Sequence, residues 1–286
     1  MSAAVAQTAG LLNDALAAIG AGRFDAARVA LARVLQDAPD HADAIGLMAV
    51  ADLNAGRAND AERRALRAMT LAPGNVQHAY TLGQALAAQG RHGEAASAYR
   101  RALAAVPHEP AIHYALGLTL AAAGHLDAAA SSFDRAAQLD PAFSAAEFQL
   151  GQVLQQAGRL EEAAAAYERG LAREPAAIGP LVNLGGVLGL LGRHVEAEEV
   201  ARRAIRLDPQ RPEPHANLAH SLSEVGRSND AIVAFERALA LGMRDAQALN
   251  GLGGALYNAG LAAQAVERYR EAANADPGFH PVRSNL

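Results

Sequence analysis

Few side chains in this sequence have the types and spacing that catalysis or metal binding requires. Cys is absent, which removes thiolate metal ligands and Cys nucleophiles. The ten His residues are scattered, none in an HExxH arrangement, and no Ser–His–Asp trio can be assembled. GLGG at 251–254 lies within a predicted helix with no strand before it, unlike a phosphate-binding loop. The sequence therefore predicts no catalytic, cofactor or metal site, and no enzymatic activity of this chain.

The residues best suited to recognition are three aromatics at one regular spacing. Tyr80, Tyr114 and Phe148 are each 34 residues apart. On neighbouring helices roughly 10 Å apart, their rings would form a stripe for the apolar side chains of a bound peptide. The alternative is that the rings fill gaps between those helices.

Amide side chains follow the same spacing one position later, although Leu47, Thr81, Ala115 and Gly251 interrupt the series. Its members are Asn13, Gln149, Asn183, Asn217 and Asn285. An amide both accepts and donates hydrogen bonds, so it can pair with the backbone of an extended peptide. The alternative is that Asn is merely tolerated at an exposed position. The predicted peptide-binding groove comprises Tyr80, Tyr114, Phe148, Gln149, Gln152, Asn183, Asn217, His220, Asn250 and Tyr257.

A 34-residue repeat positions these side chains. Counted from Thr8, it gives eight units without insertions: 8–41, 42–75, 76–109, 110–143, 144–177, 178–211, 212–245 and 246–279. Position 15 is always Gly and position 20 always Ala, while position 32 is Pro in every unit except the seventh, which has Met243. Gly ends a first helix, Pro ends a second, and the Ala column indicates two helices in close contact. Apolar residues at helical spacing between these marks predict a pair, helix A and then helix B, in every unit.

The units resemble the tetratricopeptide repeat family. The fourth unit carries the family pattern as Leu116, Gly117, Leu120, Gly124, Ala129, Phe133, Ala136 and Pro141. The resemblance implies an all-α, right-handed superhelical solenoid, with A helices on the inner face and B helices on the outer face. Residues 1–7 are then an N-terminal extension and 280–286 the start of an incomplete ninth repeat. Asp14 and Asp52 depart from the pattern, as terminal repeats commonly do.

Charge and composition narrow the class of partner. The net charge is -5, and all 25 basic residues are Arg, which is typical of a GC-rich bacterial genome. Helix A carries no Arg in any of the eight units, which argues against phosphate or a two-carboxylate clamp in the groove. Arg recurs at positions 16 and 26, where we expect an outer, solvated face. Neither nucleic acid nor a membrane is a predicted partner, and the lack of a signal peptide or spanning segment predicts a cytoplasmic protein.

The predicted function is a protein–protein interaction scaffold that binds an extended peptide or partner segment along the A helices. The alternative is the N-terminal substrate-recognition arm of a larger enzyme, resembling either a glycosyltransferase of the O-linked N-acetylglucosamine transferase type or a sulfotransferase with such repeats. SNL at 284–286 aligns with 182–184 and 216–218, so we expect the native protein to continue beyond Leu286. An uncapped last repeat would expose the seam near Tyr269 and Ala272 and favour an end-to-end homodimer.

Overall fold

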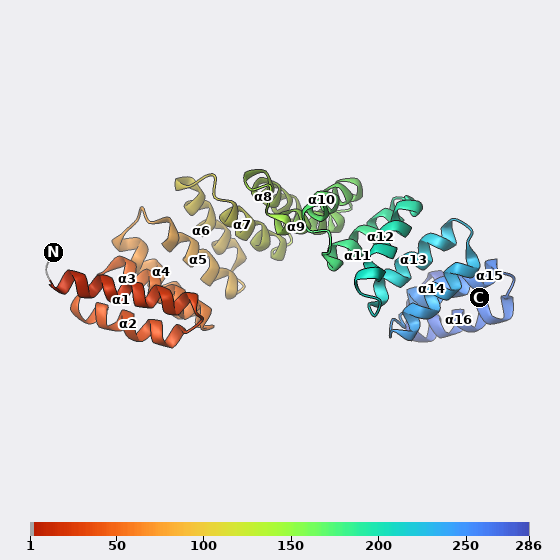
Figure 1. Ribbon diagram of the computed structural model, residues 1–286, viewed down its shortest axis with the longest axis horizontal. Helices are drawn as coiled ribbons and strands as arrows, with labels where there is room; N and C mark the ends of the chain where they lie inside the picture. Colours follow the sequence, from red (N-terminus) through yellow and green to blue (C-terminus); the bar gives the residue numbers. More distant parts are fainter. Residues whose placement is uncertain (1–2, 286) are drawn as a thin grey trace. The chain divides into compact units, whose positions relative to one another are not determined.

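The computed structural model describes residues 3–285, and within them all regular structure is helical (Figure 1). Two compact units divide the chain, one ending at Pro141 and the other beginning at Ala142. The helices of the first unit are α1 (Ala3–Gly20), α2 (Phe24–Asp37), α3 (Ala42–Asn54), α4 (Ala58–Leu71), α5 (Val76–Ala88), α6 (His92–Ala105), α7 (Pro110–Ala122) and α8 (Leu126–Leu139).

The second unit repeats the same pattern of helix pairs and adds a short terminal helix. Its helices are α9 (Ser144–Gln156), α10 (Leu160–Arg173), α11 (Ile178–Leu190), α12 (His194–Leu207), α13 (Pro212–Glu224), α14 (Ser228–Ala240), α15 (Ala246–Asn258), α16 (Ala262–Ala275) and α17 (Pro281–Asn285). Helix A of each predicted unit has an odd number and helix B an even number. Within each compact unit, successive A helices also contact one another, as α11 does α13 and α13 does α15.

The repeated Gly and Ala columns shape each helix pair as predicted. All eight Gly at position 15, from Gly22 to Gly260, have φ between 71° and 81°, the left-handed conformation that ends helix A. All eight Ala at position 20, from Ala27 to Ala265, are 0% exposed. In the seventh repeat Gly242, with φ 101°, makes the turn next to the Met243 that replaces Pro. The two columns therefore confirm the predicted turn and the predicted close approach of helices A and B.

Aromatic side chains at position 24 fill the seam between the helices of a pair. Phe133 on α8 is 0% exposed, and its ring lies against Gly117 on α7. A Cβ atom at Gly117 would be 2.7 Å from Cε1 of Phe133, so no larger residue fits without displacing the ring. The same pairing recurs as Tyr99 with Gly83, Tyr167 with Gly151 and Tyr269 with Gly253. These rings are therefore core residues of the helix pairs.

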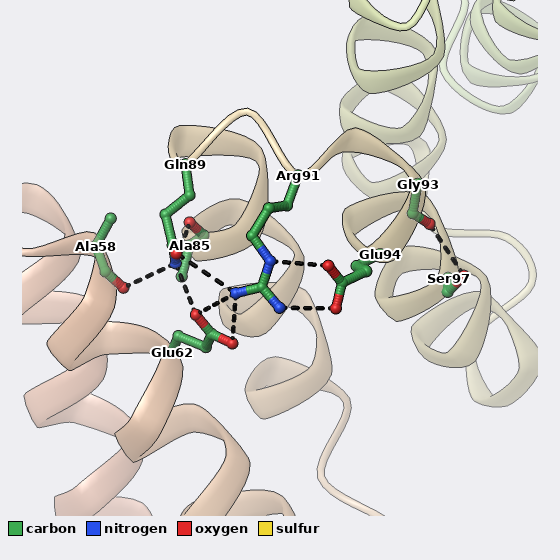
Figure 2. A network of polar contacts seen from close by, with 8 residues as sticks. All are labelled: Ala58, Glu62, Ala85, Gln89, Arg91, Gly93, Glu94 and Ser97. Carbon is green, nitrogen blue, oxygen red and sulfur yellow. Dashed lines mark hydrogen bonds and ion pairs between the residues drawn. The ribbon is translucent and has the colours of Figure 1, made fainter.

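Arginine side chains join consecutive repeats. Arg91, before α6, donates hydrogen bonds to both Glu62 of α4 and Glu94 of α6 (Figure 2). The N–O distances are 2.7–2.8 Å. Gln89 donates to the same Glu62 carboxylate at 2.8 Å. The hydrogen bond from Gln89, followed by that from Arg91, lowers the pKa of Glu62. Other arginines reach back to the closing turn of the preceding repeat, as Arg67 does to the Pro39 carbonyl oxygen at 3.0 Å.

The second repeat departs from the pattern at Asp52, as the sequence indicated. This carboxylate is 0% exposed and sits among three guanidinium groups. Arg28 Nε lies 2.9 Å and Arg57 Nε 3.2 Å from its Oδ1, and Arg64 pairs with its Oδ2. Burying a charge is costly unless it is paired, and these arginines supply the pairing.

Helices reach both ends of the described part of the chain. Helix α1 begins at Ala3, inside the segment predicted as an extension, and residues 1–2 lie outside the described part. At the other end, Val282 of α17 is buried in the same cluster as Tyr269 and Ala272. The apolar seam predicted to be exposed is thus covered here, and the end-to-end homodimer stays a prediction. Leu286 lies outside the described residues.

Candidate functional site

The three spaced aromatics each contact helix B of their own repeat. The rings of Tyr80 and Tyr99 have centroids 5.7 Å apart, and those of Tyr114 and Phe133 meet edge to face at 5.5 Å. All three predicted aromatics are half-buried. These rings therefore extend the aromatic seam toward the surface, and whether they also form a peptide-binding stripe stays a prediction.

Phe148 occupies a space made by a missing methyl group. A Cβ atom at Gly170 on α10 would lie 2.4 Å from Cε1 of Phe148. Position 27 is Ala in six of the eight units and Gly only at 170, so an Ala there would displace the ring. The fifth repeat thus accommodates both Phe148 and Tyr167 in one seam.

The predicted amide residues link successive repeats of the second compact unit, which begins at Ala142. Asn183 Nδ2 donates to the Tyr167 hydroxyl at 3.3 Å, and that hydroxyl donates to Gln155 Oε1 at 3.1 Å. Asn217 Nδ2 donates to the Val182 carbonyl oxygen at 2.9 Å. Burial raises the pKa of Tyr167 to about 12, which keeps its phenol protonated as a donor. Farther along, Asn285 Nδ2 donates to Asn250 Oδ1 at 2.9 Å.

A cavity of about 580 Å³ opens beside these amides. Helices α11 and α13 form most of it, with one residue each from the ends of α9 and α15. Most of its residues come from positions 2, 6, 9, 12 and 13 of helix A, the helix that the sequence predicted to line the groove. The lining residues are Gln155, Gly185, Gly186, Gly189, Leu190, Gly192, His194, Asn217, His220, Ser221, Glu224 and Gln247.

The sixth repeat has this cavity beside a seam that lacks an aromatic side chain. Its position 24 is Ala201, opposite Gly185. The nearest atom to a Cβ placed on Gly185 would be Asn217 Nδ2, at 3.2 Å. In the next repeat the Phe235 ring takes the equivalent place, with its Cζ atom 2.5 Å from a Cβ placed on Gly251. Asn217 therefore stands where a ring stands elsewhere, and it brings an amide to the cavity wall.

The cavity is polar but carries little charge. His220 is half-buried, with its ring edge-on to Phe235 at a centroid distance of 4.9 Å. Burial lowers the pKa of His220, an effect that Glu224 and Asp245 partly offset, so the ring is neutral at pH 7. Apart from histidines, Glu224 is the only ionisable residue in the lining. Amides, glycines and a neutral imidazole suit an uncharged polar ligand such as a peptide backbone.

The predicted site residues are only partly brought together. Asn217 and His220 line the cavity, and Asn183 reaches its edge through Tyr167 and Gln155. The remainder lie outside it: Tyr80, Tyr114, Phe148, Gln149, Gln152, Asn250 and, 66% exposed, Tyr257.

Five other polar lining residues were not singled out from the sequence, namely Gln155, His194, Ser221, Glu224 and Gln247. Three of these, Gln155, Glu224 and Gln247, occupy positions 12, 13 and 2 of helix A, the helix that the sequence placed on the inner face. Considering every polar residue at those positions would have found them.

Two other kinds of feature are absent from residues 3–285. Within that range, no cluster of three or more His, Cys, Asp or Glu side chains is arranged to hold a metal ion. Nor does any described helix combine the length and the apolar character needed to cross a membrane.

Comparisons with known proteins agree with the helical architecture. Two family models, both described as tetratricopeptide repeat, match residues 18–86, 80–144, 114–178, 148–212 and 217–278. No curated protein matches the sequence.

Solved structures share the fold at low sequence identity. The C-terminal part of a repeat protein from Cytophaga hutchinsonii has a TM-score of 0.68 at 12% identity, covering 84% of this chain and 99% of that one. The pilF protein of Pseudomonas aeruginosa has a TM-score of 0.63 at 18% identity, covering 74% of this chain and 97% of that one. YrrB, described as having an unusual peptide-binding site, has a TM-score of 0.56 at 20% identity, covering 66% of this chain and 97% of that one.

Proposed function

The chain belongs to the tetratricopeptide repeat family, and we propose that it is an interaction scaffold that binds an extended segment of a partner protein in the cavity of α11 and α13. The observation that carries the proposal is this roughly 580 Å³ cavity, bordered by three amide side chains and a neutral imidazole. Such groups recognise peptide bonds rather than a particular charged side chain.

Asn217 is the central contact of the proposed site. Its Nδ2 is held by the Val182 carbonyl oxygen, which fixes the orientation of the amide. Its Oδ1 has no hydrogen-bond partner among the described residues and can accept from a peptide N–H group. Gln155 and Gln247, on the flanking helices α9 and α15, supply further donors and acceptors.

Glycines on α11 give a ligand close access to the helix. Gly186 and Gly189 line the cavity, and a Cβ atom at either would meet nothing within 4 Å. The absence of side chains lets a peptide backbone approach the helix directly. The peptide-binding site stated for YrrB shows that a protein of similar fold binds peptides.

The test fills the cavity without disturbing the fold. Gly186→Leu and Gly189→Leu extend into open space and replace a poor helix former, so each substitution should stabilise α11 by about 1 kcal/mol. Peptides selected from a displayed random library against the wild-type chain should bind the double variant at least roughly ten-fold more weakly. Calorimetry and fluorescence anisotropy measure the two effects.

Gly93→Leu on α6 is the matched control, because it also projects into open space and lies in the other compact unit. It should leave peptide affinity unchanged. Equal binding by the wild-type chain and the double variant, for every selected peptide, would refute the cavity as the site.

A further inference from the structure

A second cavity of about 480 Å³ lies among α12, α13 and α14, where it is lined mainly by residues of the two B helices. Its floor is aliphatic: Leu218 and Leu222 of α13 are buried, Ile205 of α12 is partly buried, and Val233 of α14 is 67% exposed. Four arginines surround this floor: Arg202, Arg206, Arg227 and Arg237. An apolar surface with a basic rim is a separate feature from the uncharged cavity on the A helices.

Two of these arginines are largely neutralised and two are not. Arg202 and Arg227 both pair with Glu198, at 2.9 and 3.0 Å, and Arg227 also pairs with Asp230 at 2.6 Å. Arg237 reaches only a neutral amide, Gln210 Oε1, at 3.4 Å. Arg206 forms no hydrogen bond or ion pair with any residue that the structure describes. Four guanidinium groups against two carboxylates leave a local charge of +2 in a chain whose net charge is -5.

The equivalent positions in the adjacent repeats carry acidic or small side chains. Position 25 is Arg202 here but Glu168 in the repeat before and Glu236 in the repeat after. Position 29 is Arg206 here and Ala in both neighbouring repeats. On α14, position 22 is Val233, and the equivalent position in the adjacent repeats is Glu199 or Glu267. Arg227 and Arg237 occupy positions 16 and 26, which carry Arg in most repeats. Arg202, Arg206 and Val233 are therefore what distinguish this interval between B helices from its neighbours.

We propose that this surface binds an acidic segment of a partner polypeptide that carries one large apolar side chain. The carboxylates would pair with Arg206 and Arg237, whose forked guanidinium groups suit carboxylate geometry. The apolar side chain would cover Val233 and Ile205. A phosphodiester backbone would use the arginines but not the aliphatic floor, which is why an acidic peptide is the better match.

The probe is a short fluorescein-labelled peptide in which Asp and Glu residues surround a central Leu. We measure its binding to the whole chain by anisotropy at low and at physiological ionic strength. Arg206→Glu with Arg237→Glu should weaken binding roughly ten-fold or more, and added salt should weaken wild-type binding. Val233→Ser should weaken binding at both salt concentrations, as should replacement of the peptide Leu by Ser.

Arg270→Glu is the control, since it occupies position 25 of the last repeat, away from this cavity. The peptide should also bind the Gly186→Leu, Gly189→Leu variant normally, which separates this proposal from the one for the A helices. Thermal melting checks that each variant is folded. The inference is overturned if the double Arg variant binds as wild type does, if no binding is detected at low salt, or if anionic phospholipid vesicles bind and the peptide does not.

Discussion

The fourth and sixth repeats use the same helix pair in opposite ways. In the fourth, Phe133 fills the space over Gly117, and Tyr114 packs on the Phe133 ring. In the sixth, Ala201 faces Gly185, an amide from the next repeat enters instead, and a cavity opens beside it. The comparison shows what the residue at position 24 decides. An aromatic side chain there fills the seam, whereas Ala leaves a polar seam that borders a cavity.

Removing the ring from the filled repeat should have the largest effect. Phe133→Ala deletes a fully buried aromatic side chain and should lower the free energy of unfolding by roughly 3–5 kcal/mol. Because repeats contact mainly their neighbours, hydrogen exchange should accelerate most in α7 and α8. Ser131→Ala, exposed on the same helix, should change little. Melting of Phe133→Ala indistinguishable from wild type would contradict the packing described for this seam.

Adding a ring to the sixth repeat should have an intermediate effect. Ala201→Phe alone collides with Asn217 and should cost about 1–3 kcal/mol, as overpacking does. Combining it with Asn217→Gly recreates the Phe235 and Gly251 arrangement, so the pair should be less destabilised than the sum of the single changes. Denaturant unfolding of the four proteins in the cycle gives the coupling. Simple additivity would show that Asn217 does not occupy the place of a ring.

The neutral His220 should give a smaller, pH-dependent effect. Burial puts its folded-state pKa below the ordinary value of about 6.5, so the unfolded chain binds more protons as the pH falls below that value. The stability contributed by neutral His220 is therefore complete above about pH 6.5 and is lost progressively at lower pH. His220→Gln should lose stability less steeply between about pH 7 and 5. The exposed residue His125 provides the control, and His125→Gln should leave the pH dependence of stability unchanged. If stability falls equally steeply with pH in the wild type and in His220→Gln, His220 is not the group responsible.

Much of the fold follows from repeated columns in the sequence. The Gly column predicted that helix A ends at each Gly and the Ala column predicted close helix contact, and the structure contains both. Repetition made these features visible because each column offers the same evidence in several units.

The candidate site is less predictable because it arises where the repetition fails. Ala201 and Gly186 look unremarkable as single letters, yet together they leave space that neighbouring repeats fill or cover. The amide series pointed to Asn217 but could not show that its Nδ2 is bound to the Val182 carbonyl. Side-chain direction in an irregular seam depends on the shapes of all the side chains that share it, and the spacing of residues does not encode that arrangement.

The buried Asp52 has a consequence for how this array was assembled from duplicated units. Its carboxylate draws Arg28 from the first repeat and Arg57 and Arg64 from the second. The second repeat is therefore not interchangeable with the others, because moving it elsewhere would separate a buried charge from one of its three counterions. Copies of a duplicated unit can in principle exchange places along the array. This ion cluster requires the second repeat to stay next to the first, where all three arginines reach Asp52.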